Sequence, residues 1–169
     1  MSNEQLAWYA LYVKSRHEFV TQGELGKKGI DAYLPAVKKV RQWKDRKKLV
    51  ELPLFPGYCF ARIAPDPEAL LTVLKTRGVV SLVSTAPGAP APVPDEEIAS
   101  LKLLVESGSE FDIYPHLKEG VRVRIKRGPL RGAEGILRKK EGAYTFLVGI
   151  ELLGRSVGVA VDGDDVETV

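Results

Sequence analysis

The second part of the chain restricts the fold more than any other feature of the sequence. After Gly120, short runs rich in β-branched residues alternate with turns that contain glycine. The runs cover residues 121–126, 133–138, 143–150 and 155–161. Short, regularly interrupted runs of this kind are typical of a small all-β domain. We therefore predict a small β-barrel here, and the glycines and β-branched residues disfavour a helical alternative for the same segment.

The first 108 residues mix helical and strand patterns. Residues 7–13 and 57–63 are apolar and aromatic, as buried strands are. The proline-rich residues 85–94 predict a loop. The acidic residues 95–97 predict the start of a helix, where negative side chains interact favourably with the positive end of the helix dipole. The predicted elements are strands at 7–13, 57–63 and 79–83, two hairpin arms at 33–43 and 48–52, and helices at 16–28, 66–76 and 95–108.

Composition places the chain among ordinary globular proteins, with 44% hydrophobic and 28% charged residues in 169. Cys59 is the only cysteine, so no internal disulfide is possible, which fits a reducing cytoplasm. Residues 1–13 lack the pattern of a signal peptide, and no apolar stretch approaches the roughly 20 residues that span a bilayer. We expect a cytoplasmic protein with no membrane partner, and nothing in the sequence requires more than a monomer.

The net charge of +3 is distributed unevenly. Residues 1–108 hold 15 Lys/Arg and 12 Asp/Glu, whereas residues 109–169 hold 10 of each. Within residues 38–48, seven of eleven side chains are basic and one is acidic. Basic side chains neutralise phosphates and an indole can stack on an unpaired base, although a solvated hairpin tip also explains the run. The predicted nucleic-acid-binding residues of this run are Lys38, Lys39, Arg41, Trp43, Lys44, Arg46, Lys47 and Lys48.

Two motifs are more specific than composition. The first is Leu54-Phe55-Pro56-Gly57-Tyr58-Cys59-Phe60, in which strand alternation separates Cys59 from its aromatic neighbours. Phe55 precedes a proline and is therefore expected in an extended bend, where its ring is available to an apolar partner. The second motif, in residues 120–135, runs from a strand into Gly-Pro-Leu-Arg-Gly-Ala-Glu-Gly.

The two motifs in this order resemble the NusG family of transcription elongation factors over nearly the whole chain. Trp8-Tyr9, Phe55-Pro56-Gly57-Tyr58 and residues 93–104 resemble its N-terminal (NGN) domain. Residues 120–169 resemble its KOW domain, including Leu153-Gly154-Arg155. The KOW pattern alone also occurs in ribosomal proteins, so the pair of motifs carries the resemblance.

The resemblance implies an α+β fold in two domains. The first is an antiparallel sheet flanked by helices, and the second is a five-stranded SH3-like barrel. We assign residues 1–108 to the NGN domain, 109–118 to a linker and 119–169 to the KOW domain. We expect no cofactor. Because the composition of residues 121–161 disfavours a helical state, we predict a barrel joined by a mobile linker, with the first domain's site at least partly open.

The resemblance further implies an apolar patch that binds the clamp helices of the largest RNA polymerase subunits. Carried over by position, the patch consists of Trp8, Leu54, Phe55 and Tyr58. Aromatic anchors that enter an apolar groove supply most of the energy in such an interface.

The family resemblance places the basic hairpin near the upstream edge of the transcription bubble. We expect it to touch upstream or non-template DNA there. Lys14 and Arg77 occupy positions that are basic in the specialised paralogue RfaH and face non-template DNA. RfaH also uses a His-Thr-Thr element where this chain has Ala69-Leu70-Leu71, so that further contact is not carried over.

Two features suggest a specialised antiterminator of the RfaH or UpxY type rather than housekeeping NusG. One is the basic hairpin, and the other is Leu153, where NusG usually has an aromatic residue that serves Rho and a ribosomal protein. The expected partner-binding residues of the KOW domain are Leu152, Leu153 and Arg155. The alternative is a housekeeping NusG that supports Rho-dependent termination.

The sequence contains few residues arranged for catalysis or metal binding. His17 and His116 lie in different predicted domains, and no His/Cys cluster has metal-binding spacing. Cys59 has no evident base, and residues 162–165 are better explained by a turn than by a calcium loop. We expect no enzyme and no bound metal. A competing class is a KOW-containing ribosomal RNA-binding protein, which needs a more basic barrel than the neutral residues 109–169.

Overall fold

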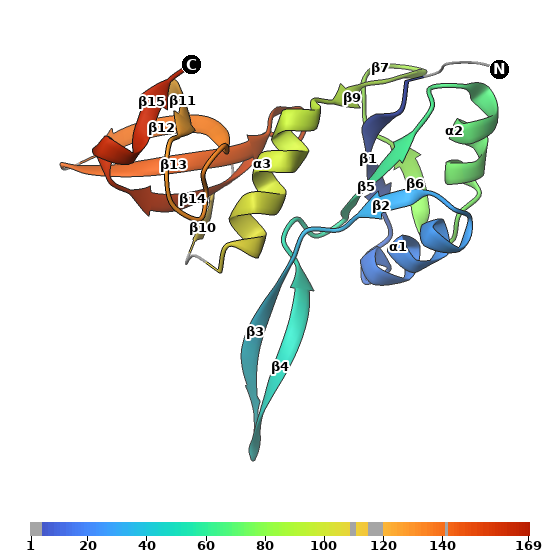
Figure 1. The fold of residues 1–169 in the computed structure, drawn as a ribbon. Coiled ribbons are helices and arrows are strands. Elements are labelled where there is room, and N and C mark those ends of the chain that lie inside the picture. The colour runs from blue at the N-terminus through green and yellow to red at the C-terminus, as the bar shows by residue number, and fades with distance from the viewer. Residues whose placement is uncertain (1–4, 109–110, 115–119, 141) are drawn as a thin grey trace. The chain divides into compact units, whose positions relative to one another are not determined.

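The computed structural model describes residues 5–108, 111–114, 120–140 and 142–169. The chain divides into two units, residues 1–92 and 93–169 (Figure 1). The elements of the first unit are β1 (Ala7–Val13), α1 (Glu18–Lys27), β2 (Asp31–Tyr33), β3 (Ala36–Trp43), β4 (Arg46–Pro53), β5 (Tyr58–Ile63), α2 (Pro67–Leu74), β6 (Val79–Leu82), β7 (Ser84–Ala86) and β8 (Ala89–Pro90). The division falls inside β9 (Pro92–Val93).

The first unit is built on an antiparallel sheet with the strand order β2-β5-β1-β6. In its centre β1 pairs with β5 from Ala7 opposite Ile63 to Tyr12 opposite Tyr58. Successive side chains alternate between the two faces, as expected for a strand. One face carries the apolar core that α1 and α2 cover; its members include Tyr9, Leu11, Val13, Cys59, Ala61, Leu25 and Val73. The strands predicted at 7–13, 57–63 and 79–83, the helices predicted at 16–28 and 66–76, and the separation of Cys59 from Tyr58 and Phe60 are confirmed. The loop predicted at 85–94 is wrong in part, because most of this segment lies in the short strands β7, β8 and β9.

Local sequence signals set the ends of α2. The side chain of Asp66 accepts a hydrogen bond from the backbone N–H of Ala69 at 2.7 Å, and Pro67 occupies the first turn. Both are favoured at a helix N-terminus, because the cap satisfies a free N–H and proline has none to satisfy. The apolar side of this helix then contributes Val73 to the core.

The β3–β4 hairpin differs from its predicted form. Trp43 pairs with Arg46, so the turn contains only Lys44 and Asp45, not the four residues 44–47. Lys44 has φ 22°, at the margin of the left-handed region that two-residue hairpin turns use. The hairpin projects away from the sheet of its unit (Figure 1).

The second unit contains α3 (Asp95–Glu106) and a sheet with the strand order β10-β14-β13-β12-β11-β15. Its strands are β10 (Asp112–Tyr114), β11 (Val121–Ile125), β12 (Glu134–Lys140), β13 (Ala143–Ile150), β14 (Arg155–Val161) and β15 (Val166–Thr168). The short 3-10 turns η1 (Glu151–Leu153) and η2 (Gly163–Asp165) connect strands. The α+β fold and the β-structure predicted after Gly120 are confirmed.

The segment 109–118, predicted as a linker, contains strand β10. Asp112–Tyr114 pairs with residues 156–158 of β14 and forms one edge of the six-stranded sheet. These three residues of the predicted linker therefore form a strand, whereas the sequence predicted a loop. The other predicted linker residues, 109–110 and 115–118, lie outside the described residues, as does His116.

Helix α3 packs on the β-structure of the second unit, against β12 and β13. The Ser100 hydroxyl accepts the backbone N–H of Glu134 at 3.0 Å, and the Glu97 carboxylate accepts that of Glu151 at 3.0 Å. These contacts explain why the division falls before α3 instead of within 109–118. The prediction that residues 1–108 form one domain stays a prediction.

Candidate functional site

A pair of tyrosines lies on the face of the first unit's sheet that is opposite α1 and α2. Tyr12 of β1 and Tyr58 of β5 are register partners, with ring centroids 5.2 Å apart and ring planes inclined at 43°. Tyr12 is 41% exposed and Tyr58 is half-buried. The neighbouring Tyr58 phenol, and secondarily burial, raise the pKa of Tyr12. The two rings together form an aromatic surface.

The other predicted polymerase-binding residues lie close to this pair in the chain but are buried. Trp8 is on the same face of β1 as Tyr12, and Phe55 is only 1% exposed. Gly57, with φ 86°, forms a tight turn in which the Tyr58 N–H donates to the Phe55 carbonyl at 3.1 Å. Leu54 and Phe55 lie in a bend before this turn, as expected, but both side chains are buried. Their polymerase contact, like that of Trp8, stays a prediction.

Tyr12 is a candidate that the sequence analysis missed. The signal was available, because in a strand Tyr12 shares a face with residues two and four positions earlier, including Trp8. What the sequence did not supply was the register that sets Tyr12 beside Tyr58. The structure thus adds Tyr12 to the four predicted residues and shows that Trp8, Leu54 and Phe55 are buried beside the half-buried Tyr58.

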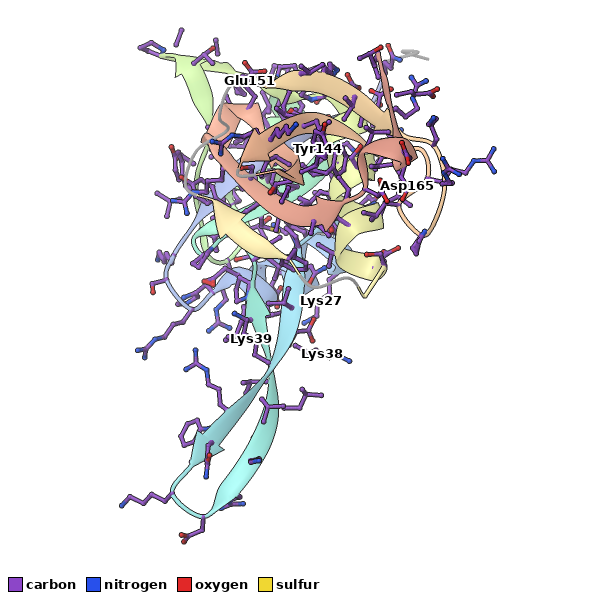
Figure 2. The ribbon with its side chains drawn as sticks, turned by 90° about the vertical axis from the view of Figure 1, so that its left-hand side faces the viewer. Lys27, Lys38, Lys39, Tyr144, Glu151 and Asp165 are labelled. Atoms are coloured by element: carbon purple, nitrogen blue, oxygen red, sulfur yellow. The ribbon has the colours of Figure 1, made fainter. Side chains whose placement is uncertain are left out.

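The β3–β4 hairpin presents the predicted nucleic-acid-binding residues to solvent. Residues 38–49 are all exposed, and Trp43 is 60% exposed. The labelled Lys38 and Lys39 lie on opposite sides of the hairpin (Figure 2). Among the residues that the structure describes, none of the ion pairs includes a cation of this hairpin. The cations are therefore available to a polyanion.

The structure also brings Lys14 and Arg77 to one place. The backbone N–H of Lys14 donates to the carbonyl of Gly78 at 2.8 Å, and the Arg77 carbonyl accepts from the Thr21 hydroxyl at 2.9 Å. Both side chains are exposed. The backbones at Lys14 and Arg77 therefore lie close together, although 63 positions separate the two residues, and their contact with DNA stays a prediction.

The predicted partner-binding residues of the second unit gather at one turn. Leu152 and Leu153 belong to η1, and Arg155 begins β14 directly after Gly154, which has φ 63°. All three side chains are half-buried. A single turn thus displays two apolar side chains beside a basic one.

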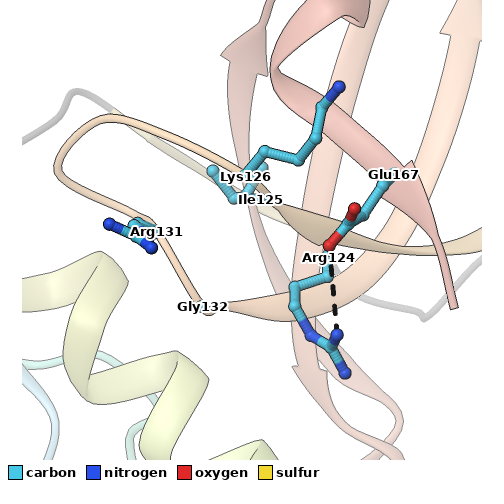
Figure 3. Close-up of a pocket in the computed structure, with 6 residues that line it drawn as sticks. All are labelled: Arg124, Ile125, Lys126, Arg131, Gly132 and Glu167. Carbon is cyan, nitrogen blue, oxygen red and sulfur yellow. Dashed lines mark ion pairs between the residues drawn. The ribbon is translucent and has the colours of Figure 1, made fainter.

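A shallow cavity of about 340 Å³ lies on the second unit, lined by Arg124, Ile125, Lys126, Arg131, Gly132 and Glu167 (Figure 3). Arg124 forms ion pairs with Glu134 at 2.6 Å and with Glu167 at 3.9 Å. The Arg124 guanidinium holds the pKa of the Glu134 carboxyl below its ordinary value. Because opposite charges meet across β12, β11 and β15, we interpret this cluster as a brace between strands.

Groups suited to catalysis are scarce among the described residues. Burial raises the pKa of the Cys59 thiol to about 12, so this side chain packs in the core as a protonated thiol. Residues 162–165 form a turn in which the Asp162 carboxylate accepts the N–H of Asp164 at 3.1 Å, as predicted. The described parts of the chain contain no group of three or more potential metal ligands. They also contain no helix with the length and apolarity needed to cross a membrane.

A family model described as "Transcription termination factor nusG" matches residues 6–102, more than half of the chain. The chain belongs to the NusG family. The match begins next to β1 and extends through most of α3, so it includes both tyrosines and the basic hairpin. The predicted family and the α+β fold are thereby confirmed.

Two curated NusG proteins are similar to this chain. The transcription termination/antitermination protein NusG of Borreliella burgdorferi is 28% identical, over 96% of this chain and 98% of the relative. The same protein of Lactococcus lactis is 29% identical, over 73% of this chain and 67% of the relative. The solved structure of Thermotoga maritima NusG, at 24% identity, covers 98% of both chains with a TM-score of 0.50 and supports the fold. The chain is thus a transcription factor of the NusG termination/antitermination family.

Proposed function

We propose that this NusG-family protein binds the clamp helices of RNA polymerase through its first unit and promotes elongation and antitermination in the cytoplasm. The Tyr12–Tyr58 pair carries this proposal. It is an aromatic surface on the sheet face opposite α1 and α2, and the predicted contact residues Trp8, Leu54 and Phe55 are its near neighbours in the chain.

The physical basis is recognition of a helical surface by aromatic anchors. Tyrosine supplies a large apolar ring at a low cost in conformational entropy, and its hydroxyl keeps a hydrogen bond to water or partner. An adaptor that binds one clamp conformation more tightly than another shifts the polymerase toward that conformation. Suppressed pausing follows from this shift, and no catalytic group of the adaptor takes part.

Capture of purified RNA polymerase by the immobilised full chain tests the docking surface. Tyr12→Ala and Tyr58→Ala are each expected to weaken binding by tenfold or more, about 1.4 kcal/mol. Phe19→Ala is the matched control, because Phe19 is 40% exposed and lies on α1, which packs on the other face of the sheet. Binding by both tyrosine variants as tight as wild type excludes this surface.

The same proposal gives the β3–β4 hairpin, with Lys14 and Arg77, the task of contacting upstream or non-template DNA. The exposure and unpaired charge of the hairpin support it. The η1 turn, with Leu152, Leu153 and Arg155, is proposed to recruit a second partner such as Rho or a ribosomal protein.

We further propose that the protein promotes readthrough rather than Rho-dependent termination, because Leu153 lacks the aromatic ring expected at that position. The half-buried Leu153 presents an apolar but non-aromatic surface. A Rho-dependent termination assay with purified components tests this choice. Reduced or unchanged termination supports a specialised antiterminator, whereas enhanced termination assigns the protein a housekeeping role.

A further inference from the structure

The register of the β3–β4 hairpin divides its basic residues between two unlike faces. In an antiparallel pair, directly opposite residues lie on the same side of the ribbon, and the side alternates at each step. Figure 2 shows this alternation for Lys38 and Lys39. The run of basic residues is therefore not one continuous positive surface.

One face, which we name the basic face, combines cations with the exposed indole. Trp43 lies opposite Arg46, Arg41 opposite Lys48, and Lys39 opposite Val50. The side chains that share this face and carry its chemistry are Lys39, Arg41, Trp43, Arg46 and Lys48. Four positive charges and no carboxylate stand on the paired positions of this face.

The reverse face is nearly neutral and partly apolar. Lys38 lies opposite Glu51, Val40 opposite Leu49, and Gln42 opposite Lys47. Two lysines and one glutamate leave a net charge of +1 on these positions. Val40 and Leu49 are both exposed, so the centre of the reverse face is an aliphatic pair.

The basic face carries an unfavourable arrangement within the isolated protein. Arg41 and Lys48 are like charges directly opposite each other, which destabilises a strand pair. Among the described residues, no ion pair relieves them. A polyanion bound along this face would remove the repulsion between Arg41 and Lys48. The repulsion matters because an isolated two-stranded hairpin is only marginally stable.

We propose that the basic face binds an unpaired nucleic-acid strand, with Trp43 stacked on a base and Lys39, Arg41, Arg46 and Lys48 against phosphates. This inference deepens the proposed DNA contact of the hairpin and rests on it. Positions 39 to 43 span about 14 Å at the rise of a strand, so the row covers a few nucleotides. An indole can stack only where a base exposes its flat face, which a duplex does not offer along its side.

Tryptophan fluorescence of the full chain tests the stacking. The chain has two tryptophans, and Trp8 is buried while Trp43 is exposed. Titration with a short oligothymidylate is expected to quench the emission, and Trp43→Leu is expected to abolish the quenching. A duplex of the same length is expected to bind with little quenching. Absence of quenching by both the oligothymidylate and an oligouridylate of the same length, or equal quenching by the duplex, overturns the stacking on an unpaired base.

A charge-matched pair of variants tests the face. Arg41→Gln/Lys48→Gln removes two positive charges from the basic face, and Lys38→Gln/Lys47→Gln removes two from the reverse face. The first is expected to weaken oligothymidylate binding by tenfold or more and to lower the salt slope by about 1.4, as for two phosphate contacts on a single strand. The second is expected to weaken binding by less than threefold. Equal losses overturn the assignment to one face.

Two further measurements test whether the ring of Trp43 and the type of single strand determine the binding. Trp43→Phe keeps a ring that can stack and is expected to retain most of the affinity that Trp43→Leu loses; equal loss in both contradicts stacking. A titration with oligouridylate shows whether RNA or DNA binds more tightly, and quenching by either supports the unpaired strand. Retained polymerase capture with no oligonucleotide binding overturns only this inference, whereas lost capture with intact binding overturns only the polymerase docking.

Discussion

Ser100 of α3 and Glu134 of β12 are joined by a hydrogen bond from the Glu134 backbone N–H to the Ser100 hydroxyl oxygen, at 3.0 Å. The serine side chain is buried, so water does not replace it easily. Together with the hydrogen bond from the Glu151 N–H to the Glu97 carboxylate, this bond attaches α3 at the start of β12 and directly after the end of β13. The attachment therefore depends on two polar side chains of one helix.

We predict that Ser100→Ala lowers the free energy of unfolding of the second unit by about 1–2 kcal/mol, because the N–H of Glu134 loses its acceptor. Urea unfolding followed by circular dichroism measures the change. Ser84→Ala serves as control, since Ser84 is exposed and is expected to change stability by no more than about 0.5 kcal/mol. A Ser100→Ala variant as stable as the control contradicts a structural role for this bond.

Glu97 predicts a pH dependence of that attachment. Burial raises the pKa of its carboxyl above the ordinary 4.5, although the hydrogen bond from Glu151 opposes this. A raised pKa in the folded state means that the stabilising contribution is present below 4.5 and is lost as the pH rises through the folded value. Glu97→Gln keeps an acceptor without the buried charge, so we expect its stability relative to wild type to increase as the pH rises from 4 to neutrality. A difference independent of pH rejects this account.

The pH dependence of stability that arises from Glu134 has the opposite sign to that from Glu97. Hydrogen bonds and ion pairs from Arg124 first, and from Arg122 in addition, lower its pKa below 4.5. Its contribution is therefore present above that value and is lost as the pH falls through the lower folded value. We expect Glu134→Gln to destabilise the protein at neutral pH and to flatten the acid side of the stability curve, measured by thermal unfolding between pH 2 and 7. Glu167→Gln, which removes a single pair at 3.9 Å, is expected to do less.

Gly78 predicts a steric requirement in the first unit. Its φ is 91°, and a Cβ at this position would collide with the hydroxyl oxygen of Thr21. We expect Gly78→Ala to lower the free energy of unfolding by about 2 kcal/mol or more, from left-handed strain and the clash together. Gly88 has φ 73° with open space around it, so Gly88→Ala is expected to cost only the strain, about 1 kcal/mol. Equal losses in the two variants would show that the close approach to Thr21 does not matter.

Much of the fold followed from the sequence. The apolar runs placed β1 and β5, the helical pattern of residues 66–76 placed α2, and the alternation of glycines with β-branched residues placed the second unit's strands. The family followed as well, because the two motifs occur together and in order. These signals are local, and each depends on residues within a few positions of one another.

Tertiary packing determined which residues of the candidate site are buried and which are accessible. The sequence identified Trp8, Leu54 and Phe55 by their position in a motif, but a motif does not say whether a ring faces inward or outward. The turn at Gly57 folds Phe55 into the interior and leaves Tyr58 accessible. Tyr12 joined the site only through its register with Tyr58.

The hairpin shows the same division between sequence and tertiary structure. Its basic composition was evident, and the two-residue period alone assigns Lys38 and Lys39 to opposite sides. The partners of these residues depended on the turn, since the predicted four-residue tip would have set Trp43 opposite Lys48 instead of Arg46. Residue types and periods determined which elements form and what chemistry they carry. Register and burial, which join residues far apart in the chain, decided which of those side chains act together, because a pairing across strands is a property of two segments and not of either one.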